Sequence, residues 1–438
     1  MTSDPDDYDN PIDHDGSNDS EDFDDPDTPD GGSDADPAAL AERVASGDLR
    51  IHELESATDH ETAAAARRLF VERETDATLD AVGRYSFDAA DADPNIENMI
   101  GAVEVPVGVA GPVPVSGGAV EGAKYLPLAT TEGALVASVN RGCTAIRDSG
   151  RANARVLKSR MTRAPVFRVT DVTEAEAVVA WVREHTEELR EAAEGTTSHG
   201  QLVDATPYVV GDSVFVRFGY DTKDAMGMNM ATIATQAACD VIEERTPASL
   251  VALSGNLCTD KKPAAIDATQ GRGRTVTADV CIPREVLEDR LHTTPEAVAE
   301  INTRKNLVGS AKAVSLGFNA QAANVVAAAF LAMGQDAAQV VEGANTITTA
   351  NVRNGGETLY ASVSLASLEV GTVGGGTKLP TQAESLDVVG VRGGGDPPGG
   401  NADALAEVIA AGVLAGELSL LGALASRHLS SAHEQLGR

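Results

Sequence analysis

Two adjacent lysines stand out among the residues whose types could do chemistry. They are Lys261 and Lys262, in the stretch SGNLCTDKKPAA at 254–265, where they follow a cysteine and Asp260. The whole chain of 438 residues has only 8 lysines. A solvated pair on a loop is the ordinary explanation of such a doublet, but it is a poor one in a chain that uses lysine so sparingly. We therefore expect this stretch to belong to a functional site.

Three other stretches carry residues of chemical interest, and each also has a plain structural explanation. In TTEGALVASVNRG, Glu132 opens a predicted helix, where an acid pairs with the helix dipole and a threonine can cap the free N–H groups. In DAMGMNM at 224–230, methionines at helical spacing are typical of a core. The glycine between them would also let a flat ligand or a pyrophosphate approach free N–H groups. In GQDAAQ, Asp336 follows an apolar helix and can begin the next one. Each stretch is a weak signal alone, and the four together are a strong one.

Several common signatures are missing from the sequence. There is no GxGxxG, the usual dinucleotide fingerprint. GTVGGGTK resembles a P-loop but ends in Thr-Lys instead of Lys-Thr, which argues against a nucleoside triphosphatase. His428 and His433 are five residues apart, which on a helix turns them about 140° from each other and is wrong for a shared metal. The four cysteines show no CxxC pair or zinc spacing, so we predict no metal site and a reduced, cytoplasmic setting.

The chain is strongly acidic, with a formal net charge of −33. Residues 1–36 hold 15 acids and no Lys or Arg, a composition typical of a disordered, solvated tail. The rest of the chain has 52 of the 67 acids against all 34 bases, which leaves −18. Strong salt screens exposed charges beyond a few ångströms, so this composition indicates a protein adapted to very high salt. It also argues against nucleic acid, which needs a basic footprint.

Hydrophobic periodicity predicts the order of the structural elements. Helical patterns cover about 37–90, and valines alternating among Gly and Pro after residue 95 predict strands and turns. Residues 165–253 then read as strand, helix, two strands about the tight turn GDS, helix and strand. This is the βαββαβ order of a ferredoxin-like domain.

A long apolar helix is predicted at about 401–434. Glu407 and Glu417 interrupt its apolar residues, which suits a core helix better than a membrane span. The N-terminus lacks the basic and apolar regions of a signal peptide. We therefore expect a protein that does not enter a membrane.

Taken together, the motifs resemble one family closely, the hydroxymethylglutaryl-coenzyme A reductases of the class shared by eukaryotes and most archaea. The strings ENMIG, PVGVAGP, TTEGALVAS, DAMGMNM, SGNLCTDKKPAA, NLVGSA and GTVGGGT are similar to its signatures and occur in the family order, over about 95–438. The resemblance implies an α+β fold. Its expected parts are a large dimerising domain (95–164 and 254–438), an inserted ferredoxin-like domain that binds NADPH (165–253), a small N-terminal helical section (37–94) and a disordered acidic tail (1–36).

The reaction implied by the resemblance is the reduction of 3-hydroxy-3-methylglutaryl-CoA to mevalonate with two NADPH, which feeds isoprenoid synthesis. Negative charge develops on the substrate oxygen at each reduction, and the resemblance makes Lys261 the cation that stabilises it. Glu132 is similar to the family's proton donor, which needs a pKa raised by burial. Asp336 would bridge Lys261 and Glu132, and His433 would protonate the departing coenzyme A thiolate.

Other residues acquire binding roles through the same resemblance. The positions expected near the hydroxymethylglutaryl group or coenzyme A are Ser138, Asn140, Arg141, Arg163, Ser254, Asn256, Asp260, Lys262, Asn324 and His428. Those expected at the nicotinamide cofactor are Asp224, Met226, Gly227, Met228, Asn229, Met230 and Arg438. The implied partners are the small-molecule substrate and further copies of the chain, in a homodimer or homotetramer with shared active sites, and neither a membrane nor nucleic acid.

One departure from the family pattern lies near the expected substrate, and two alternative functions remain open. Gln321 stands where the family commonly has a histidine, and an amide cannot carry charge.

One alternative function is the reverse, degradative reaction with NAD. The other is an inactive regulator that only binds acyl-CoA. Such a regulator is expected to lose at least one of Glu132, Lys261, Asp336 and His433, and the chain keeps all four.

Overall fold

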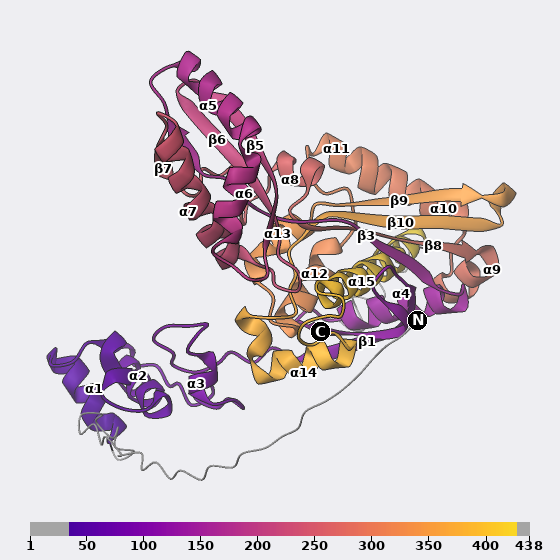
Figure 1. The fold of residues 1–438 in the computed structure, drawn as a ribbon. Helices are drawn as coiled ribbons and strands as arrows, with labels where there is room; N and C mark the ends of the chain where they lie inside the picture. The colour runs from indigo at the N-terminus through magenta and orange to yellow at the C-terminus, as the bar shows by residue number, and fades with distance from the viewer. Residues whose placement is uncertain (1–34, 427–438) are drawn as a thin grey trace, which may run out of the picture. The chain divides into compact units, whose positions relative to one another are not determined.

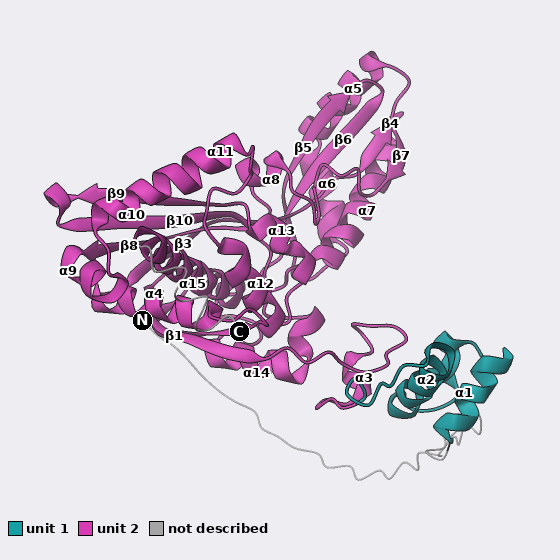
Figure 2. Ribbon diagram, turned by 180° about the vertical axis from the view of Figure 1, so that it is seen from behind, with its two compact units in different colours: residues 1–83 teal, residues 84–438 magenta. Residues whose placement is uncertain are grey.

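The structure, a computed structural model, describes residues 35–426 (Figure 1). Most of the predicted acidic tail lies outside this part, as do three predicted site residues, His428, His433 and Arg438. The chain divides into two compact units, residues 1–83 and 84–438 (Figure 2).

The first unit is helical, as its sequence predicts. It contains α1 (Pro37–Ser46), a short helix η1 (Ile51–Ser56) and α2 (His60–Thr75). The side chains of Asp36 and Asp59 accept hydrogen bonds from free N–H groups in the first turns of α1 and α2. Leucines and alanines from the three helices form a small core of their own.

The second unit is built around a central sheet. Its strands are β1 (Val107–Ser116), β2 (Glu121–Ala129), β3 (Ala152–Arg163), β8 (Gly273–Pro283), β9 (Thr346–Arg353) and β10 (Thr358–Leu368). The order β3-β8-β10-β9 is antiparallel throughout, and β1 pairs antiparallel with β2 and parallel with β3. In β8 and β10, alternate apolar residues are buried, which is the pattern of a sheet with one covered face. The valine-rich strands predicted after residue 95 are confirmed as β1 and β2.

Two helices form the core against this sheet, α4 (Leu135–Asp148) and α15 (Gly400–Ala425). They pack against each other, and α15 also contacts β3, β8 and β10. The helices approach so closely that a Cβ atom at Gly142 would lie 1.9 Å from the carbonyl oxygen of Ala415. Only glycine fits at this contact, so a chain poor in aromatic residues gains its packing from small side chains in close contact.

Helix α15 is the one helix in the described part of the chain that is long and apolar enough to cross a membrane. Its most apolar stretch is nevertheless 83% buried inside the protein. Glu407 and Glu417 are buried with it and accept hydrogen bonds from the N–H groups of Gly118, at 2.8 Å, and Gln321, at 2.6 Å. The helix is therefore the core helix that the sequence predicts.

The elements between residues 165 and 253 share an apolar core that also includes Met161 of β3. These elements are β4 (Val166–Arg168), α5 (Val172–Glu184), α6 (Thr186–Glu194), β5 (Gln201–Val210), β6 (Ser213–Asp221), α7 (Met228–Arg245) and β7 (Ser249–Ala252). The strands pair antiparallel in the order β7-β4-β6-β5, and the end of β3 joins this sheet by pairing with β6. The single helix predicted after β4 is wrong in one respect, because the backbone leaves the helical conformation at His185, whose ring stacks on Trp181.

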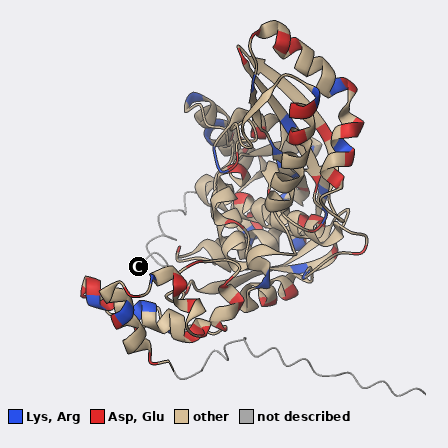
Figure 3. Ribbon diagram, turned by 60° about the vertical axis from the view of Figure 1, so that its left-hand side comes forward, with Lys and Arg blue, Asp and Glu red and all other residues tan. Residues whose placement is uncertain are grey.

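Shorter elements connect these layers. They are α3 (Ala89–Ala92), α8 (Ala265–Gln270), α9 (Arg284–Val286), η2 (Leu287–Leu291), α10 (Pro295–Ile301), η3 (Asn302–Gly309), α11 (Ser310–Lys312), α12 (Ala322–Ala332), η4 (Ala337–Gln339), α13 (Val340–Gly343), η5 (Asn354–Gly356), η6 (Gly375–Lys378) and α14 (Pro380–Val389). Acidic residues are distributed along the helices and loops of both units, as the red segments of Figure 3 show.

Candidate active site

The segment 253–264 between β7 and α8, which we call the lysine loop, has an unusual backbone. Asn256, Thr259 and Lys261 have positive φ angles of 61°, 55° and 60°. For a residue with a side chain this conformation costs roughly 1–2 kcal/mol, so other contacts must hold it. At the end of the loop the Lys261 ammonium lies 2.7 Å from the Asp336 carboxylate. The hydrogen bond to Asp336 raises the pKa of Lys261, so the ammonium stays charged at neutral pH.

Asp260 and Lys262, on either side of Lys261, are held by different partners. The Asp260 carboxylate lies 3.0 Å from the Arg272 guanidinium and 4.0 Å from that of Arg163. The Lys262 ammonium turns back and donates to the Asp260 backbone carbonyl at 2.9 Å. The predicted substrate-binding residues Arg163, Asp260 and Lys262 are thus brought together next to the Lys261–Asp336 pair.

At the beginning of the loop, a serine lies beside a buried cysteine. Ser254 Oγ lies 3.7 Å from the sulfur of Cys258, which is fully buried. All four cysteines of the chain are free thiols. Among residues 35–426, no group of three or more His, Cys, Asp or Glu side chains is arranged to hold a metal ion.

A cavity of about 620 Å³ opens beside Asp336. Its lining includes residues 225–230 from DAMGMNM, Gly334, Gln335 and Asp336, and residues 371 and 373–377 from GTVGGGT. DAMGMNM and GTVGGGT, which are about 145 residues apart in sequence, therefore face the same space. The volume lies within the range of small-molecule sites.

The walls of this cavity suit a flat, negatively charged ligand. Helix α7 begins after Gly227, which has φ 87° and provides no side-chain cap, so the first N–H groups of an 18-residue helix are left for a ligand. A Cβ atom at Gly227 would lie 2.3 Å from the side chain of Thr222. At Gly374 and Gly375, in contrast, a Cβ atom would enter open space. Gly227 thus provides a backbone conformation that favours glycine, and Gly374 and Gly375 leave room for a ligand.

Asp224, which is expected at the cofactor, binds backbone groups, and its place at the cofactor stays a prediction. It is buried, and its carboxylate accepts hydrogen bonds from the N–H groups of Gly395, Gly399 and Ala402, at 2.7–3.0 Å. Asp224 does not line the cavity but fixes the glycine-rich segment that leads into α15. The other predicted cofactor residues of the described chain, Met226 to Met230, do line it.

A second cavity, of about 390 Å³, lies between α4, α12 and the end of α15. Glu132, Ser138, Arg141 and Asn324 line it, and all four are predicted site residues. Asn324 Nδ2 donates to the Glu132 carboxylate at 3.3 Å. Ser138 Oγ and Arg141 Nε lie 2.9 and 3.0 Å from Ser419 Oγ of α15.

The predicted threonine cap at the start of α4 is wrong. The helix begins at Leu135, after Ala134 in the left-handed conformation, and no side chain caps it. Thr130 Oγ1 instead accepts a hydrogen bond from the N–H of Glu132 at 3.0 Å. Glu132 is therefore in a turn before the helix, where it is not a first-turn acid and is free to face the cavity.

Asn140 does not line this cavity, and its predicted contact with coenzyme A stays a prediction. Its Oδ1 accepts from the N–H of Gly111 at 2.8 Å, and its Nδ2 donates to the carbonyl of Val109 at 3.3 Å. Both contacts tie α4 to an irregular position in β1, where the register with β2 shifts.

Within one chain, Glu132 and Lys261 belong to different parts of the site. Glu132 contacts Asn324 in the first turn of α12, whereas Asp336 follows the last turn of the same helix. An 11-residue helix is roughly 16 Å long, so α12 separates the two acids by about that distance. Among the described residues, no hydrogen bond or ion pair joins Glu132 to Lys261 or Asp336. The predicted bridging of Lys261 and Glu132 by Asp336 is therefore not formed within a single chain, and it stays a prediction.

Comparison with known proteins gives the family of this chain. A family profile described as "Hydroxymethylglutaryl-coenzyme A reductase" matches residues 63–438. The chain is 73% identical over 403 residues to the 3-hydroxy-3-methylglutaryl-coenzyme A reductase of Haloferax volcanii, covering 92% of this chain and all of that protein. It is 68% identical to the reductase of Halobacterium salinarum, covering 92% and 99%, respectively. This chain belongs to the hydroxymethylglutaryl-coenzyme A reductase family.

Solved structures of the reductase family share the fold. The class II 3-hydroxy-3-methylglutaryl-CoA reductase of Streptococcus pneumoniae, in a structure described as bound to NADPH in open conformations, superposes with a TM-score of 0.62. The match covers 88% of this chain and 98% of that one at 20% identity, and so it concerns the fold alone.

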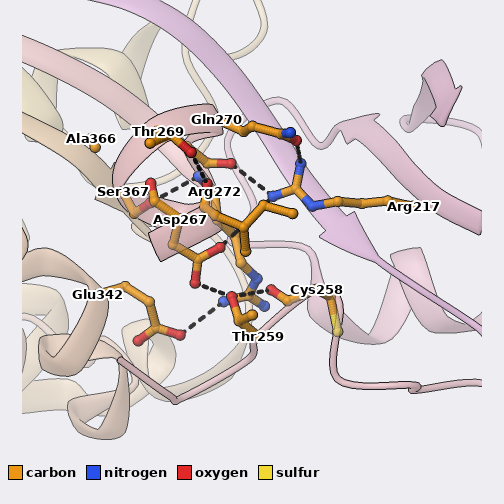
Figure 4. Close-up of polar contacts among 12 residues, drawn as sticks. Arg217, Cys258, Thr259, Asp267, Thr269, Gln270, Arg272, Glu342, Ala366 and Ser367 are labelled. Carbon is orange, nitrogen blue, oxygen red and sulfur yellow. Dashed lines mark hydrogen bonds and ion pairs between the residues drawn. The ribbon is translucent and has the colours of Figure 1, made fainter. Parts of the chain in front are cut away.

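The sequence did not point to a cluster of buried charges behind the reductase's lysine loop. Its members are Asp267, Arg272, Glu342 and Glu369. Arg272 lies 3.6 Å from Glu342 (Figure 4) and 3.2 Å from Glu369. The one signal available was the presence of charged residues in apolar surroundings, as in VVEG at 340–343 and SLEV at 367–370. Lys305, in the second cavity, was also missed.

Proposed function

We propose that this chain reduces 3-hydroxy-3-methylglutaryl-CoA to mevalonate and free coenzyme A, with two NADPH and two protons consumed. The observation that carries the proposal is the Lys261–Asp336 pair at the edge of the glycine-lined cavity, in a chain 73% identical to a named reductase. A charged lysine held beside a cofactor-sized space is what carbonyl reduction requires.

The residues around the first cavity fit NADPH. The uncapped start of α7 can hold the pyrophosphate, while Met226, Met228 and the glycines of GTVGGGT supply the walls for a flat ring. When bound, NADPH supplies a hydride to the substrate carbonyl. Arg438 is expected at the same site but lies outside the described residues.

Lys261 and Asp336 act on the oxygen of the substrate. As the thioester and then the aldehyde are reduced, negative charge grows on that oxygen, and the fixed ammonium of Lys261 stabilises it more than it stabilises the ground state. Asp336 keeps the ammonium charged and oriented. By family resemblance, Asp260, Lys262 and Arg163, together with Ser254 and Asn256, would bind the carboxylate and hydroxyl groups of the substrate.

Glu132 and the second cavity act on the proton and on coenzyme A. Asn324 orients the Glu132 carboxyl group, which would deliver the proton to the reduced oxygen. Arg141 and Lys305 place two positive charges in the cavity, which suits the phosphates of coenzyme A. By family resemblance His433 protonates the departing thiolate and His428 contacts coenzyme A, and both lie outside the described residues.

A second copy of the chain would complete the site. Because α12 separates Glu132 from Asp336 within one chain, we propose that Glu132 of one copy meets the Lys261–Asp336 pair of another, in a homodimer or a homotetramer. Two such sites form in a symmetric pair of chains.

We further propose the domain arrangement expected from the family. Residues 165–253 would be the inserted ferredoxin-like cofactor domain within a large domain of residues 95–164 and 254–438. The strand order β7-β4-β6-β5 and the separate apolar core support this division. The four free thiols are consistent with a reduced, cytoplasmic setting.

A spectrophotometric assay tests the function directly. The full-length protein in salt of about 1 M or above is mixed with hydroxymethylglutaryl-CoA and NADPH, and NADPH absorbance is followed. We expect two NADPH to be oxidised for each mevalonate formed, with NADH a poorer donor. Formation of hydroxymethylglutaryl-CoA from mevalonate and coenzyme A with NAD, and none of the forward reaction with NADPH, would support the degradative alternative. Substrate binding without turnover would support the regulator.

A further inference from the structure

The left-handed backbone of Lys261 needs a partner that holds it. Its N–H donates to Glu342 Oε1 at 2.5 Å. Glu342 is in α13 and is fully buried, so the acceptor cannot move out into solvent. A short bond from a buried carboxylate to this N–H fixes the point from which the lysine side chain extends.

Arg272 in turn holds Glu342. The guanidinium is fully buried and lies 3.6 Å from Glu342 (Figure 4). It also lies 3.2 Å from Glu369 and 3.0 Å from Asp260. One arginine therefore contacts the residue before Lys261 in sequence and also the carboxylate that binds the Lys261 N–H. This arrangement clamps the Lys261 backbone from both sides.

The cluster contains more acid than its cations can neutralise. Asp260, Glu342 and Glu369 share Arg272, while Asp267 lies 3.7 Å from Arg217 and accepts a hydrogen bond from Thr259. Burial raises the pKa of Glu342 to about 7 and that of Glu369 well above its usual range. A buried cluster of this kind is weak evidence for stabilisation of the fold, because desolvation offsets the attraction. The contact of the cluster with the Lys261 N–H indicates instead that the cluster positions the lysine.

We propose that Glu342 is a positioning residue for Lys261, holding the left-handed N–H so that the ammonium meets Asp336, with Arg272 holding Glu342 in place. The inference rests on the proposed function for its catalytic meaning. It makes a geometric claim as well: without the Glu342 acceptor, the Lys261 backbone relaxes and the ammonium loses its 2.7 Å contact with Asp336.

The kinetic test compares three substitutions of Glu342. Glu342→Gln keeps an oxygen acceptor of the same length, Glu342→Ala removes it, and Glu342→Asp draws it back by one methylene. We expect the Ala and Asp variants to lose about 10- to 100-fold in kcat, because small displacements of a catalytic group cost about that much. KM for hydroxymethylglutaryl-CoA should stay within about threefold, and the Gln variant should keep at least a third of wild-type kcat.

Glu407→Ala is the matched control. Glu407 is also a buried carboxylate that accepts backbone N–H groups, from Gly118 at 2.8 Å and Ala119 at 2.9 Å, but it lies on α15 and touches no residue of the lysine loop. The Glu407→Ala substitution should lower the melting temperature without lowering kcat of the folded protein. If Glu342→Ala behaved in the same way, Glu342 would be structural only.

A second readout does not depend on turnover. With only 8 lysines in the chain, NMR of ¹³Cε-labelled lysine can follow the titration of Lys261, assigned through Lys261→Ala. We expect the pKa of Lys261 to fall in Glu342→Ala and to stay high in Glu342→Gln. An unchanged titration in the Ala variant would overturn the inference. An inactive wild-type protein with the expected titrations would overturn the proposed function and leave the inference standing.

Discussion

Asp336 uses its two carboxylate oxygens for two different contacts, and Lys261 receives one of them. Oδ1 accepts a hydrogen bond from the N–H of Ala338 at 3.1 Å and so caps helix η4, while Oδ2 lies 2.7 Å from the Lys261 ammonium. Because the cap fixes the side-chain torsion of Asp336, the oxygen that faces Lys261 is held in place before substrate binds. The plain explanation of Asp336 as a helix-capping acid is therefore confirmed, and the same geometry supports its proposed role beside Lys261.

Lys261→Ala should abolish nearly all turnover and leave coenzyme A binding largely intact. The ammonium acts mainly on charge that develops during reduction, and loss of such a partner costs ~100- to 1,000-fold or more in rate. The measurement is kcat by NADPH oxidation, together with the Kd of coenzyme A by calorimetry. Lys262→Ala is the matched control and should mainly raise KM. A Lys261→Ala variant with a tenth of wild-type turnover would contradict the assigned role.

Two inactive variants should restore activity when they are mixed. Lys261→Ala and Glu132→Gln each disable every site in their own oligomers. If a site takes Glu132 from one chain and Lys261 from another, half of randomly reassembled dimers are mixed, and each mixed dimer has one intact site. We then expect about a quarter of wild-type activity after dissociation and reassembly. No recovery, in a mixture shown to contain mixed oligomers, would mean that both residues act from one chain.

Gly227→Ala should weaken NADPH binding. Alanine strains the backbone at φ 87°, and its methyl group would meet Thr222 at 2.3 Å, so the start of α7 must shift. We expect KM for NADPH to rise about tenfold or more, since the N–H groups that face the ligand move with the helix. Gly47→Ala is the control, because Gly47 has a similar φ of 82° but no atom within 4 Å of an added Cβ. Equal effects of the two substitutions on NADPH binding would argue against this site.

Stability should fall as pH rises from 5 to 8 at constant salt. Burial raises the pKa of Glu342 to about 7, and also raises those of Asp267, Glu369 and Glu417 above the usual 4 to 4.5. The folded state holds these protons more tightly than the unfolded chain, so their stabilisation is complete below about pH 4 and is lost through the folded pKa. Chemical denaturation at each pH measures the effect.

The matched variant for this experiment is Glu342→Gln. Its amide does not titrate, so the unfolding free energy should depend less steeply on pH near 7 than in the wild type. Acids with lowered pKa, such as Glu55 beside Arg67, have finished titrating by pH 5 and do not affect this window. Stability that rises between pH 5 and 8 would contradict the prediction.

A chain shortened to begin at Pro37 should keep both activity and salt requirement. Residues 1–36 have almost no apolar content, so they cannot offset the entropy of ordering. The remaining excess of −18 is spread over the protein (Figure 3), and its repulsion acts over ~30 Å in dilute buffer but ~3 Å at 1 M salt. Circular dichroism and NADPH oxidation across a potassium chloride series would compare the two chains. If truncation alone removed the salt requirement, the tail would be the salt-dependent element.

Local patterns allowed much of the fold to be predicted from the sequence. Strand, turn and helix signals gave the order of elements in residues 165–253, and Glu407 and Glu417 indicated a core helix. The departures have local causes that pattern analysis does not detect. His185 breaks a helix whose apolar periodicity continues past it, and Ala134 adopts a left-handed conformation that moves the start of α4 beyond Glu132.

The site was predictable where its residues lie in continuous motifs and not where tertiary contacts assemble it. DAMGMNM and GTVGGGT do line one cavity. Asp224, in DAMGMNM, and Asn140, in TTEGALVASVNRG, instead bind backbone groups, so membership in a motif did not show which side chains line a cavity. Glu342 and Arg272 are 70 residues apart in sequence, and only folding reveals that they meet behind Lys261.

The two buried glutamates of α15 make the length of this helix harder to change than its composition. Glu407 binds the loop at 118–120 and Glu417 binds the start of α12, so one rigid rod ties together two segments that are distant in sequence. Inserting or deleting one residue between them would rotate one carboxylate by about 100° and shift it by about 1.5 Å relative to the other. One of the two loops would then lose its acceptor inside the core. In alignments of homologous chains, this ten-residue interval should therefore tolerate replacements but no gaps.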